Sequence, residues 1–139
     1  MAEKKYEKIV KTFYDALEEG KVLGRKCTAC GHIEFPPYLA CNTCGNLDTE
    51  WIDITDRNAM LTYILPPAKA FSDAEFGRQV GPYCLAAVQP EDADEVNTCL
   101  IGCDPARADE LASKLPLPVV PIILQQDGYK MVFWKLADE

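Results

Sequence analysis

The stretch CTACGHIEFPPYLACNTCG, residues 27–45, contains two C-x-x-C pairs that are separated by ten residues. Its four cysteines are Cys27, Cys30, Cys41 and Cys44. A C-x-x-C pair folds readily into a tight turn that places both sulfurs on one metal ion, and two such turns build a closed tetrahedral site. Gly31 and Gly45 directly follow the two pairs, and glycine tolerates the positive φ that the turn requires. The spacing therefore predicts a structural zinc ion in a rubredoxin-like ribbon.

Two other uses of the four thiols remain open at this point. The same ligand set holds iron in rubredoxin, and a C-x-x-C pair can act as a dithiol redox centre. His32, the single histidine of the chain, is expected to be a surface residue and not a ligand, because four cysteines already complete a tetrahedron. Zinc is the favoured interpretation.

Composition limits the class of protein. The chain has 139 residues, of which 48% are hydrophobic, which suits one compact domain with a small appendage. No apolar run approaches the roughly 20 residues that span a bilayer, and the first residues, MAEKKYEKIV, lack the apolar core of a signal peptide. We therefore expect no membrane partner and a cytoplasmic location, where thiols stay reduced.

Charge argues against a nucleic-acid partner. The formal net charge is −8, and residues 51–139 carry seven basic against fourteen acidic residues. Because affinity for nucleic acids depends on cations that neutralise phosphates, such a chain would be repelled. The stretch VNTCLI, residues 96–101, also lacks the cations and stacking aromatic residues of a nucleic-acid-binding barrel. A nucleic-acid-binding protein stays only as the weakest alternative.

The pattern of apolar residues predicts a mainly β protein. Residues 4–19 have apolar side chains at helical spacing and are followed by Gly20, which is typical of an amphipathic helix and its stop. Five β-like runs follow, at residues 60–65, 83–89, 96–101, 119–124 and 129–136. A helix is expected at residues 104–115, between the third and fourth runs. This order is that of an OB-fold barrel, so we predict a helix at 1–22, a zinc ribbon at 23–50 and an OB-fold domain at 51–139.

Together, these features resemble a known family. The ribbon with its double proline, Trp51 and the stretch GPYCLAAVQ at residues 81–89 are similar to zinc-ribbon/OB-fold proteins associated with acyl-CoA enzymes. Members of that family serve as small subunits beside thiolases, thiolase-like aldolases or hydratases. Within it, the chain looks most similar to small subunits of thiolases for aromatic acyl-CoA esters such as benzoylsuccinyl-CoA.

Several positions depart from the family pattern. The family commonly has Arg after the double proline and Pro after the third cysteine, where this chain has Tyr38 and Asn42. The segments DRNAM at residues 56–60 and EDADEV at residues 91–96 replace a glycine-rich entry and an acidic-Gly turn. None of these changes removes a metal ligand, but they leave open which partner surface the chain fits.

The resemblance implies a non-catalytic subunit. It implies a zinc-binding chain in a hetero-oligomeric thiolase that cleaves a 3-oxoacyl-CoA with CoA, and an aldolase or hydratase complex is the alternative. The residues of the chain are consistent with a non-catalytic role, because thiolytic cleavage needs an activated cysteine and a general base. Cys84, Cys99 and Cys103 lie in or just after predicted strands without a cation nearby in sequence, and we expect them to be buried and inert.

Two groups of residues are candidates for contacts in such a complex. The long connection at residues 66–82 could meet a coenzyme A ester or could be an ordinary loop with its phenylalanines packed under the barrel. Its candidate contact residues are Lys69, Phe71, Phe76 and Arg78. For the helix, packing within the chain and docking on a partner are both open. The candidate partner-facing residues are Tyr6, Ile9, Phe13, Leu17, Ile33, Phe35 and Tyr38.

Overall fold

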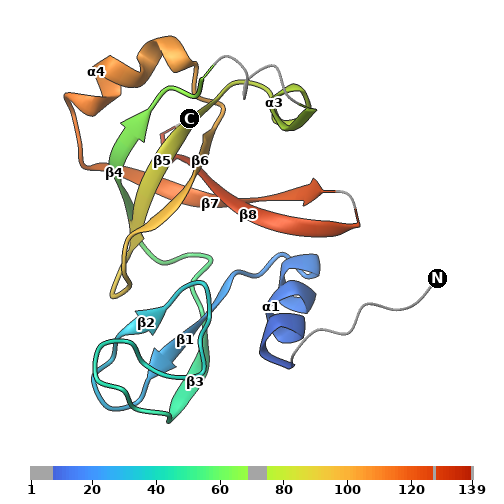
Figure 1. Cartoon of the computed structure of the whole chain (residues 1–139), viewed down its shortest axis with the longest axis vertical. Coiled ribbons are helices and arrows are strands. Elements are labelled where there is room, and N and C mark those ends of the chain that lie inside the picture. Colours follow the sequence, from blue (N-terminus) through green and yellow to red (C-terminus); the bar gives the residue numbers. More distant parts are fainter. Residues whose placement is uncertain (1–7, 69–74, 127, 139) are drawn as a thin grey trace. The chain divides into compact units, whose positions relative to one another are not determined.

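The structure is a computed structural model that describes residues 8–68, 75–126 and 128–138 (Figure 1). The chain divides into two compact units, and each is described by itself. The first unit contains the helix and the ribbon, with residues up to Asp56, Asp92–Asp94 and Ile123–Val132. The second unit contains Arg57–Glu91, Glu95–Ile122 and the chain from Phe133 onward. Within the described residues, no helix is long and apolar enough to cross a membrane.

Helix α1, Lys8–Glu18, packs against its own unit. Leu17 is buried, and the ring of Phe13 lies 6.0 Å from that of Phe35. On another side of the helix, the ring of Tyr14 meets that of Tyr129 edge-on at 6.2 Å. The helix ends as the sequence predicts, because Gly20 adopts a φ of +83° and donates its N–H to the carbonyl of Leu17.

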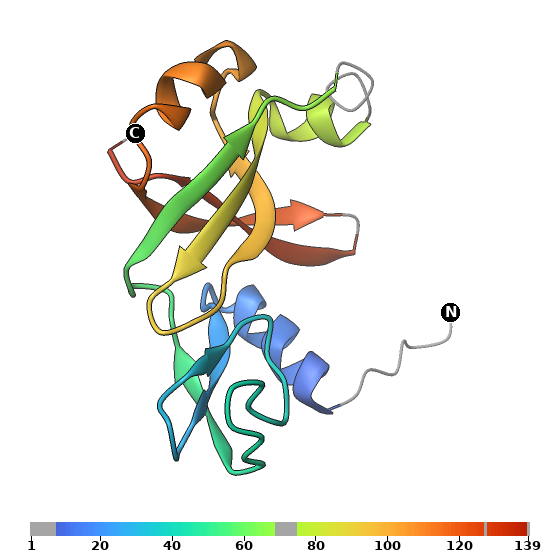
Figure 2. The ribbon, with the colours of Figure 1, turned by 60° about the vertical axis from the view of Figure 1, so that its left-hand side comes forward.

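A small antiparallel sheet forms the ribbon (Figure 2). Its strands are β1 (Leu23–Cys27), β2 (Ile33–Glu34) and β3 (Thr49–Asp53), in the spatial order β2-β1-β3. Arg25 of β1 pairs with Glu34 on one side and Trp51 on the other. These strands could not be predicted from the sequence, because they are short and carry no clear alternation of apolar and polar residues.

The five remaining strands close into a barrel, which confirms the predicted OB-type order. They are β4 (Ala59–Leu65), β5 (Tyr83–Pro90), β6 (Val96–Ile101), β7 (Leu117–Gln126) and β8 (Tyr129–Leu136). Around the barrel the order is β4-β5-β6-β8-β7. Strands β6 and β8 run parallel, whereas β4 pairs antiparallel with both β5 and β7. Leu61, Val88 and Leu100 are fully buried and belong to the core.

Two helical segments connect the barrel strands. Between β6 and β7, the 3₁₀ helix η1 (Pro105–Arg107) continues into α4 (Ala108–Ala112), so the predicted helix exists but is shorter. Asp104 caps η1 by accepting a hydrogen bond from the N–H of Ala106 at 2.9 Å. Between β4 and β5 lies a short helix, α3 (Glu75–Val80), which is not among the predicted elements.

Candidate metal centre

Two backbone turns of the same kind carry the four predicted ligands. Gly31 donates its N–H to the carbonyl of Cys27 at 3.1 Å, and Gly45 donates to the carbonyl of Cys41 at 2.8 Å. Both glycines have φ near +80°, at +79° and +78°, a conformation that side chains disfavour. Cys27 ends strand β1, so the sheet anchors the first turn. The local sequence C-x-x-C-G therefore folds twice into one knuckle shape.

The sulfur atoms converge as a metal ion requires. The Sγ atoms of Cys27 and Cys44 are 3.6 Å apart, and those of Cys30 and Cys41 are 3.5 Å apart. All four sulfurs lie within 4.8 Å of one another. Four sulfurs at about 2.3 Å from a tetrahedral zinc ion would be about 3.8 Å apart, whereas a disulfide would need about 2.05 Å. The donor set fits a structural zinc ion, and zinc is the metal of this ribbon.

The four thiols differ in their electrostatic surroundings. The backbone N–H of Cys30 points at the Cys27 sulfur and lowers the pKa of Cys27 to about 6, and the N–H of Cys44 acts likewise to lower the pKa of Cys41. At Cys30 the N–H of His32 acts in the same direction, but the sulfur of Cys41 and burial together raise the pKa to about 12. Four thiolates as close as these sulfurs would repel one another, because they carry like charges, and a divalent cation relieves that repulsion.

Asn46 supports the ligands and was missed from the sequence. Its Nδ2 lies 3.6 Å from the Cys27 sulfur and donates to the carbonyl of Asp48 at 3.2 Å, while its Oδ1 accepts the N–H of Asp48. The amide therefore orients toward a thiolate and helps to lower the pKa of Cys27. An asparagine directly after the second C-x-x-C-G was the available signal, since such residues commonly bond nearby backbone.

Asn42, which stands where the resembling family commonly has proline, has a structural role. Glu34 is buried, at 6% exposure, and its carboxylate accepts the backbone N–H of Asn42 at 2.7 Å and the Nδ2 at 3.0 Å. The proline that the family commonly has here could not donate the backbone hydrogen bond. Asn42 thus ties the second knuckle to strand β2 and compensates for the burial of a carboxylate.

Several of the candidate partner-facing residues are buried within the chain. Leu17, Ile33 and Phe35 are 1%, 0% and 8% exposed, because α1 packs on the ribbon. Tyr38 is 63% exposed, and Phe13 is partly buried. Tyr6 lies outside the described residues, and of Ile9 only the backbone is described. An interface through helix and ribbon stays a prediction, and among the candidate side chains that the structure describes, Tyr38 is the exposed one.

The predicted coenzyme A contacts are not brought together in the described residues. Lys69 and Phe71 lie outside them. Phe76 packs in the second unit, with its ring 5.3 Å from that of Tyr83 and 5.5 Å from that of Phe133. Arg78 is exposed on the same short helix, α3. The packing of Phe76 matches the ordinary-loop alternative for that residue, whereas the exposure of Arg78 is compatible with a ligand contact.

The remaining cysteines sit in environments that suppress reactivity. Cys84 and Cys103 are buried with their sulfurs 3.5 Å apart. Burial, with the Cys103 sulfur beside it, raises the pKa of Cys84 to about 12, and burial also raises the pKa of Cys99. Because the thiolate is the nucleophilic form, a raised pKa keeps the thiols of Cys84 and Cys99 unreactive near neutral pH.

Comparisons with known proteins agree with this architecture. Residues 15–50 match the family described as "ChsH2, rubredoxin-like zinc ribbon domain". A "probable enoyl-CoA hydratase alpha subunit" of Thermomonospora curvata is 25% identical over 83% of this chain and 33% of its own length. A "DUF35 domain-containing scaffold protein" of Methanothermobacter thermautotrophicus is 27% identical over 69% of this chain and 70% of its own length. The chain thus spans about a third of the first relative.

Two solved structures share the fold. One, described as "Ltp2-ChsH2(DUF35) aldolase", superposes with a TM-score of 0.65 over 97% of this chain and 99% of the other, at 20% identity. The other is a DUF35-family protein of unknown function from Sulfolobus solfataricus, with a TM-score of 0.55 over 93% and 85% of the chains, at 17% identity. Residues 15–50 therefore match a rubredoxin-like zinc ribbon of the ChsH2 type, and the comparisons support the resemblance to zinc-ribbon/OB-fold proteins associated with acyl-CoA enzymes.

Proposed function

We propose that the chain is the non-catalytic, zinc-binding subunit of a hetero-oligomeric thiolase. The complex cleaves a 3-oxoacyl-CoA with CoA into two acyl-CoA products, and an aromatic substrate such as benzoylsuccinyl-CoA would yield benzoyl-CoA and succinyl-CoA. This chain supports assembly and flanks the acyl-CoA entrance of the catalytic subunit. The proposed location is the cytoplasm, where reduced thiols persist as metal ligands.

One observation carries the non-catalytic role: outside the four zinc ligands, the described residues offer no cysteine with a lowered pKa that could act as a nucleophile. Cys84 is buried, and its pKa is raised to about 12. The single histidine, His32, lies in the ribbon, where its Nε2 faces the carboxylates of Glu34 and Asp94. Acyl transfer needs an activated nucleophile and a general base within hydrogen-bond reach, so a partner has to supply the chemistry.

The relatives' descriptions are also compatible with a second candidate. A hydratase alpha subunit, a scaffold protein and an aldolase stand among the similar proteins, so this chain could support an acyl-CoA aldolase or hydratase. All three candidate complexes share a catalytic subunit that acts on a coenzyme A ester. They differ in the reaction, because a thiolase consumes CoA, an aldolase releases a carbonyl compound without CoA, and a hydratase adds water to an enoyl-CoA.

The ribbon offers apolar side chains for assembly. Tyr38, Leu39 and Leu47 are 63%, 62% and 78% exposed. Large apolar side chains that stay exposed on a small element are candidates for a binding surface. The zinc ion would hold the turns that carry these side chains, at a distance from the reacting atoms.

Co-purification and activity measurements test the proposal. The 139-residue chain is co-expressed with a candidate thiolase-type subunit, first of all the product of a neighbouring gene if that gene encodes a thiolase, and the complex is isolated by size-exclusion chromatography. We expect CoA-dependent loss of a 3-oxoacyl-CoA from the complex and none from the isolated chain. Turnover by the isolated chain would contradict the non-catalytic role. A complex that instead releases a carbonyl compound without CoA, or hydrates an enoyl-CoA, would replace the thiolase with the second candidate.

A further inference from the structure

Strand β2 lies against a short segment from a distant part of the sequence. The N–H of Ile33 donates to the carbonyl of Asp92 at 2.7 Å, and Ile33 forms a parallel bridge with Ala93. All of these residues belong to the first compact unit. The bridge therefore aligns two backbones that about 60 residues of chain separate.

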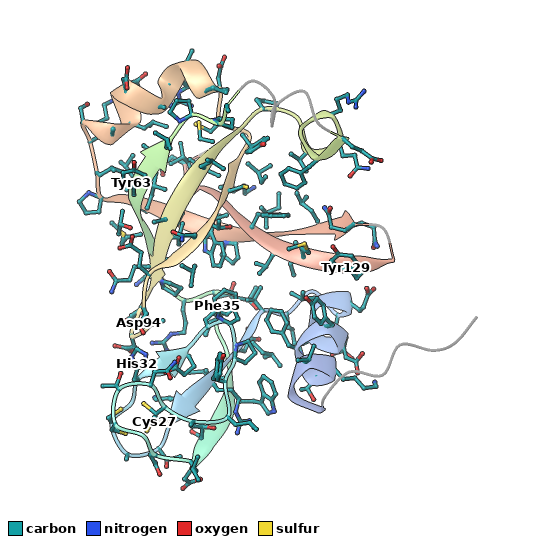
Figure 3. The ribbon with its side chains drawn as sticks, viewed as in Figure 1. Cys27, His32, Phe35, Tyr63, Asp94 and Tyr129 are labelled. Atoms are coloured by element: carbon teal, nitrogen blue, oxygen red, sulfur yellow. The ribbon has the colours of Figure 1, made fainter. Side chains whose placement is uncertain are left out.

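This alignment decides which side chains meet. Ile33 and Ala93 are both buried, at 0% and 4% exposure. Because side chains alternate between the two faces of extended backbone, the neighbours of these two residues point to the opposite face. His32 and Glu34 flank Ile33, and Asp94 follows Ala93. Figure 3 shows the labelled side chains of His32 and Asp94 next to each other.

Three metal-binding atoms converge there. His32 Nε2 lies 3.5 Å from Glu34 Oε1 and 3.5 Å from Asp94 Oδ2. The three donor atoms all lie within 4.8 Å of one another. Nε2 is buried and makes no hydrogen bond, although two carboxylate oxygens stand beside it. A buried nitrogen without a hydrogen bond is uncommon in folded proteins.

The spacing suits a shared cation better than it suits hydrogen bonds. Hydrogen bonds from N–H to oxygen are usually 2.7–3.2 Å long, shorter than either distance here. Two ligands at about 2.1 Å from one ion, at a tetrahedral angle, are about 3.4 Å apart. Glu34 is also already oriented, since Asn42 donates two hydrogen bonds to its carboxylate, and oriented carboxylates make better ligands.

We propose that His32, Glu34 and Asp94 form a second metal site, distinct from the four-cysteine site, for a divalent transition cation such as zinc. One imidazole nitrogen and two carboxylate oxygens are the donor set that zinc accepts at open sites. Water completes the coordination, since Asp94 is 75% exposed in its side chain. The bound ion cross-links strand β2 to residues 92–94.

Zinc titration of the full-length protein tests this site. We expect the purified chain to bind a second equivalent of zinc in isothermal titration calorimetry, beyond the ribbon zinc measured by elemental analysis. Removing a ligand with Asp94→Asn or His32→Ala should weaken the second equivalent by about ten-fold or more. The Glu95→Gln variant is the matched control, because it removes a neighbouring exposed acidic charge and should leave both equivalents in place.

Cobalt separates the two sites spectroscopically. Cobalt bound by thiolates has intense near-ultraviolet charge-transfer absorption, and cobalt bound by nitrogen and oxygen does not. We expect the Asp94→Asn variant to keep the charge-transfer bands while it loses the second binding event. A wild-type chain that binds a single equivalent, or an Asp94→Asn variant with an unchanged second event, would overturn the proposal. Loss of the charge-transfer bands in Asp94→Asn would overturn it too, since the sites would then not be distinct.

Discussion

Each ribbon cysteine is positioned by a backbone turn, so the ligands are placed by local sequence. The hydrogen bonds from Gly31 to Cys27 and from Gly45 to Cys41 close the two turns, and the sulfurs then face one another at 3.5–3.6 Å. A ribbon of this size has few buried apolar side chains with which to compensate for the loss of a ligand. Metal binding and folding are therefore coupled in it.

Replacing one ligand should test that coupling. In the Cys41→Ser variant we expect loss of zinc and an unfolded ribbon, because three thiolates and a hydroxyl do not complete the site. Elemental analysis measures the zinc, and limited proteolysis with mass spectrometry locates cleavage within residues 23–50. The Cys99→Ser variant is the control, since Cys99 lies in β6 outside the ribbon. A Cys41→Ser chain with full zinc content and intact ribbon would contradict the assignment.

The ligand set could be predicted from sequence, whereas its surroundings could not. Spacing reveals Cys27 and Cys30 because both sit in one local turn. The contacts Glu34–Asn42 and His32–Asp94 depend on how strand β2 packs against other segments of the chain. No local sequence pattern predicts that packing. His32 was expected at the surface, but its side chain is 15% exposed, because residues 92–94 lie against β2.

Helix α1 illustrates how an amphipathic pattern leaves its partner unspecified. The spacing of apolar residues predicted the helix, and the stop at Gly20 is confirmed. The pattern could not show that Phe13 faces Phe35 and that Tyr14 faces Tyr129, since those contacts join residues far apart in sequence. Likewise, α3 was missed because six residues, EFGRQV, are too few to show a helical period.

Shortening the buried side chain of Leu17 in α1 should destabilise the first unit. Leu17 is 1% exposed, so Leu17→Ala should lower the free energy of unfolding of that unit by about 2–5 kcal/mol. Urea unfolding followed by the fluorescence of Trp51, in a Trp134→Phe background, reports on this unit. Lys11→Ala is the control on the same helix, where loss of the exposed pair with Asp15 should cost about 0.5 kcal/mol or less. Equal effects of the two changes would show that the helix is not anchored by Leu17.

Helix α3 presents an exposed cation next to an anchored aromatic ring. Phe76 holds the helix against Tyr83 and Phe133, while Arg78 is exposed. If Arg78 binds a phosphate or carboxylate of the ester, Arg78→Ala should raise the KM for the coenzyme A ester about ten- to a hundred-fold, as expected for a loss of about 1.5–3 kcal/mol. Gln79→Ala is the neighbouring control. An unchanged KM in the Arg78→Ala complex would assign α3 a structural role.

For the molecule as a whole, the order of elements was more predictable than the limits of its compact units. The five barrel strands begin and end within two residues of the predicted runs, because alternation and turn residues are local signals. The first compact unit, by contrast, gathers the helix, the ribbon, residues 92–94 and residues 123–132. That grouping depends on long-range packing, and the predicted boundaries at 22 and 50 stay predictions.

Assembly with a catalytic subunit should depend on the exposed ribbon residues. We expect the Tyr38→Ala, Leu47→Ala double variant to weaken association by roughly ten-fold or more, as for apolar residues central to an interface. Analytical ultracentrifugation of the mixed subunits measures this, and zinc content shows that the ribbon stays folded. Tyr63→Ala is the control, because Tyr63 is a tyrosine of similar exposure on β4. If Tyr63→Ala alone weakens association, the barrel makes the contact.

In the closed barrel, strand β6 pairs with β8 over a much shorter length than it pairs with β5. Among the described residues, β6 and β8 are joined by a single register pair, Leu100 with Trp134, whereas β5 and β6 pair along residues 83–88 and 96–101. A partial opening of the sheet costs least where the fewest backbone pairs break. Amide protons of β8 should therefore exchange with deuterated solvent before those of β5. The opened form would present two bare strand edges, and such edges are where chains of this kind begin to aggregate.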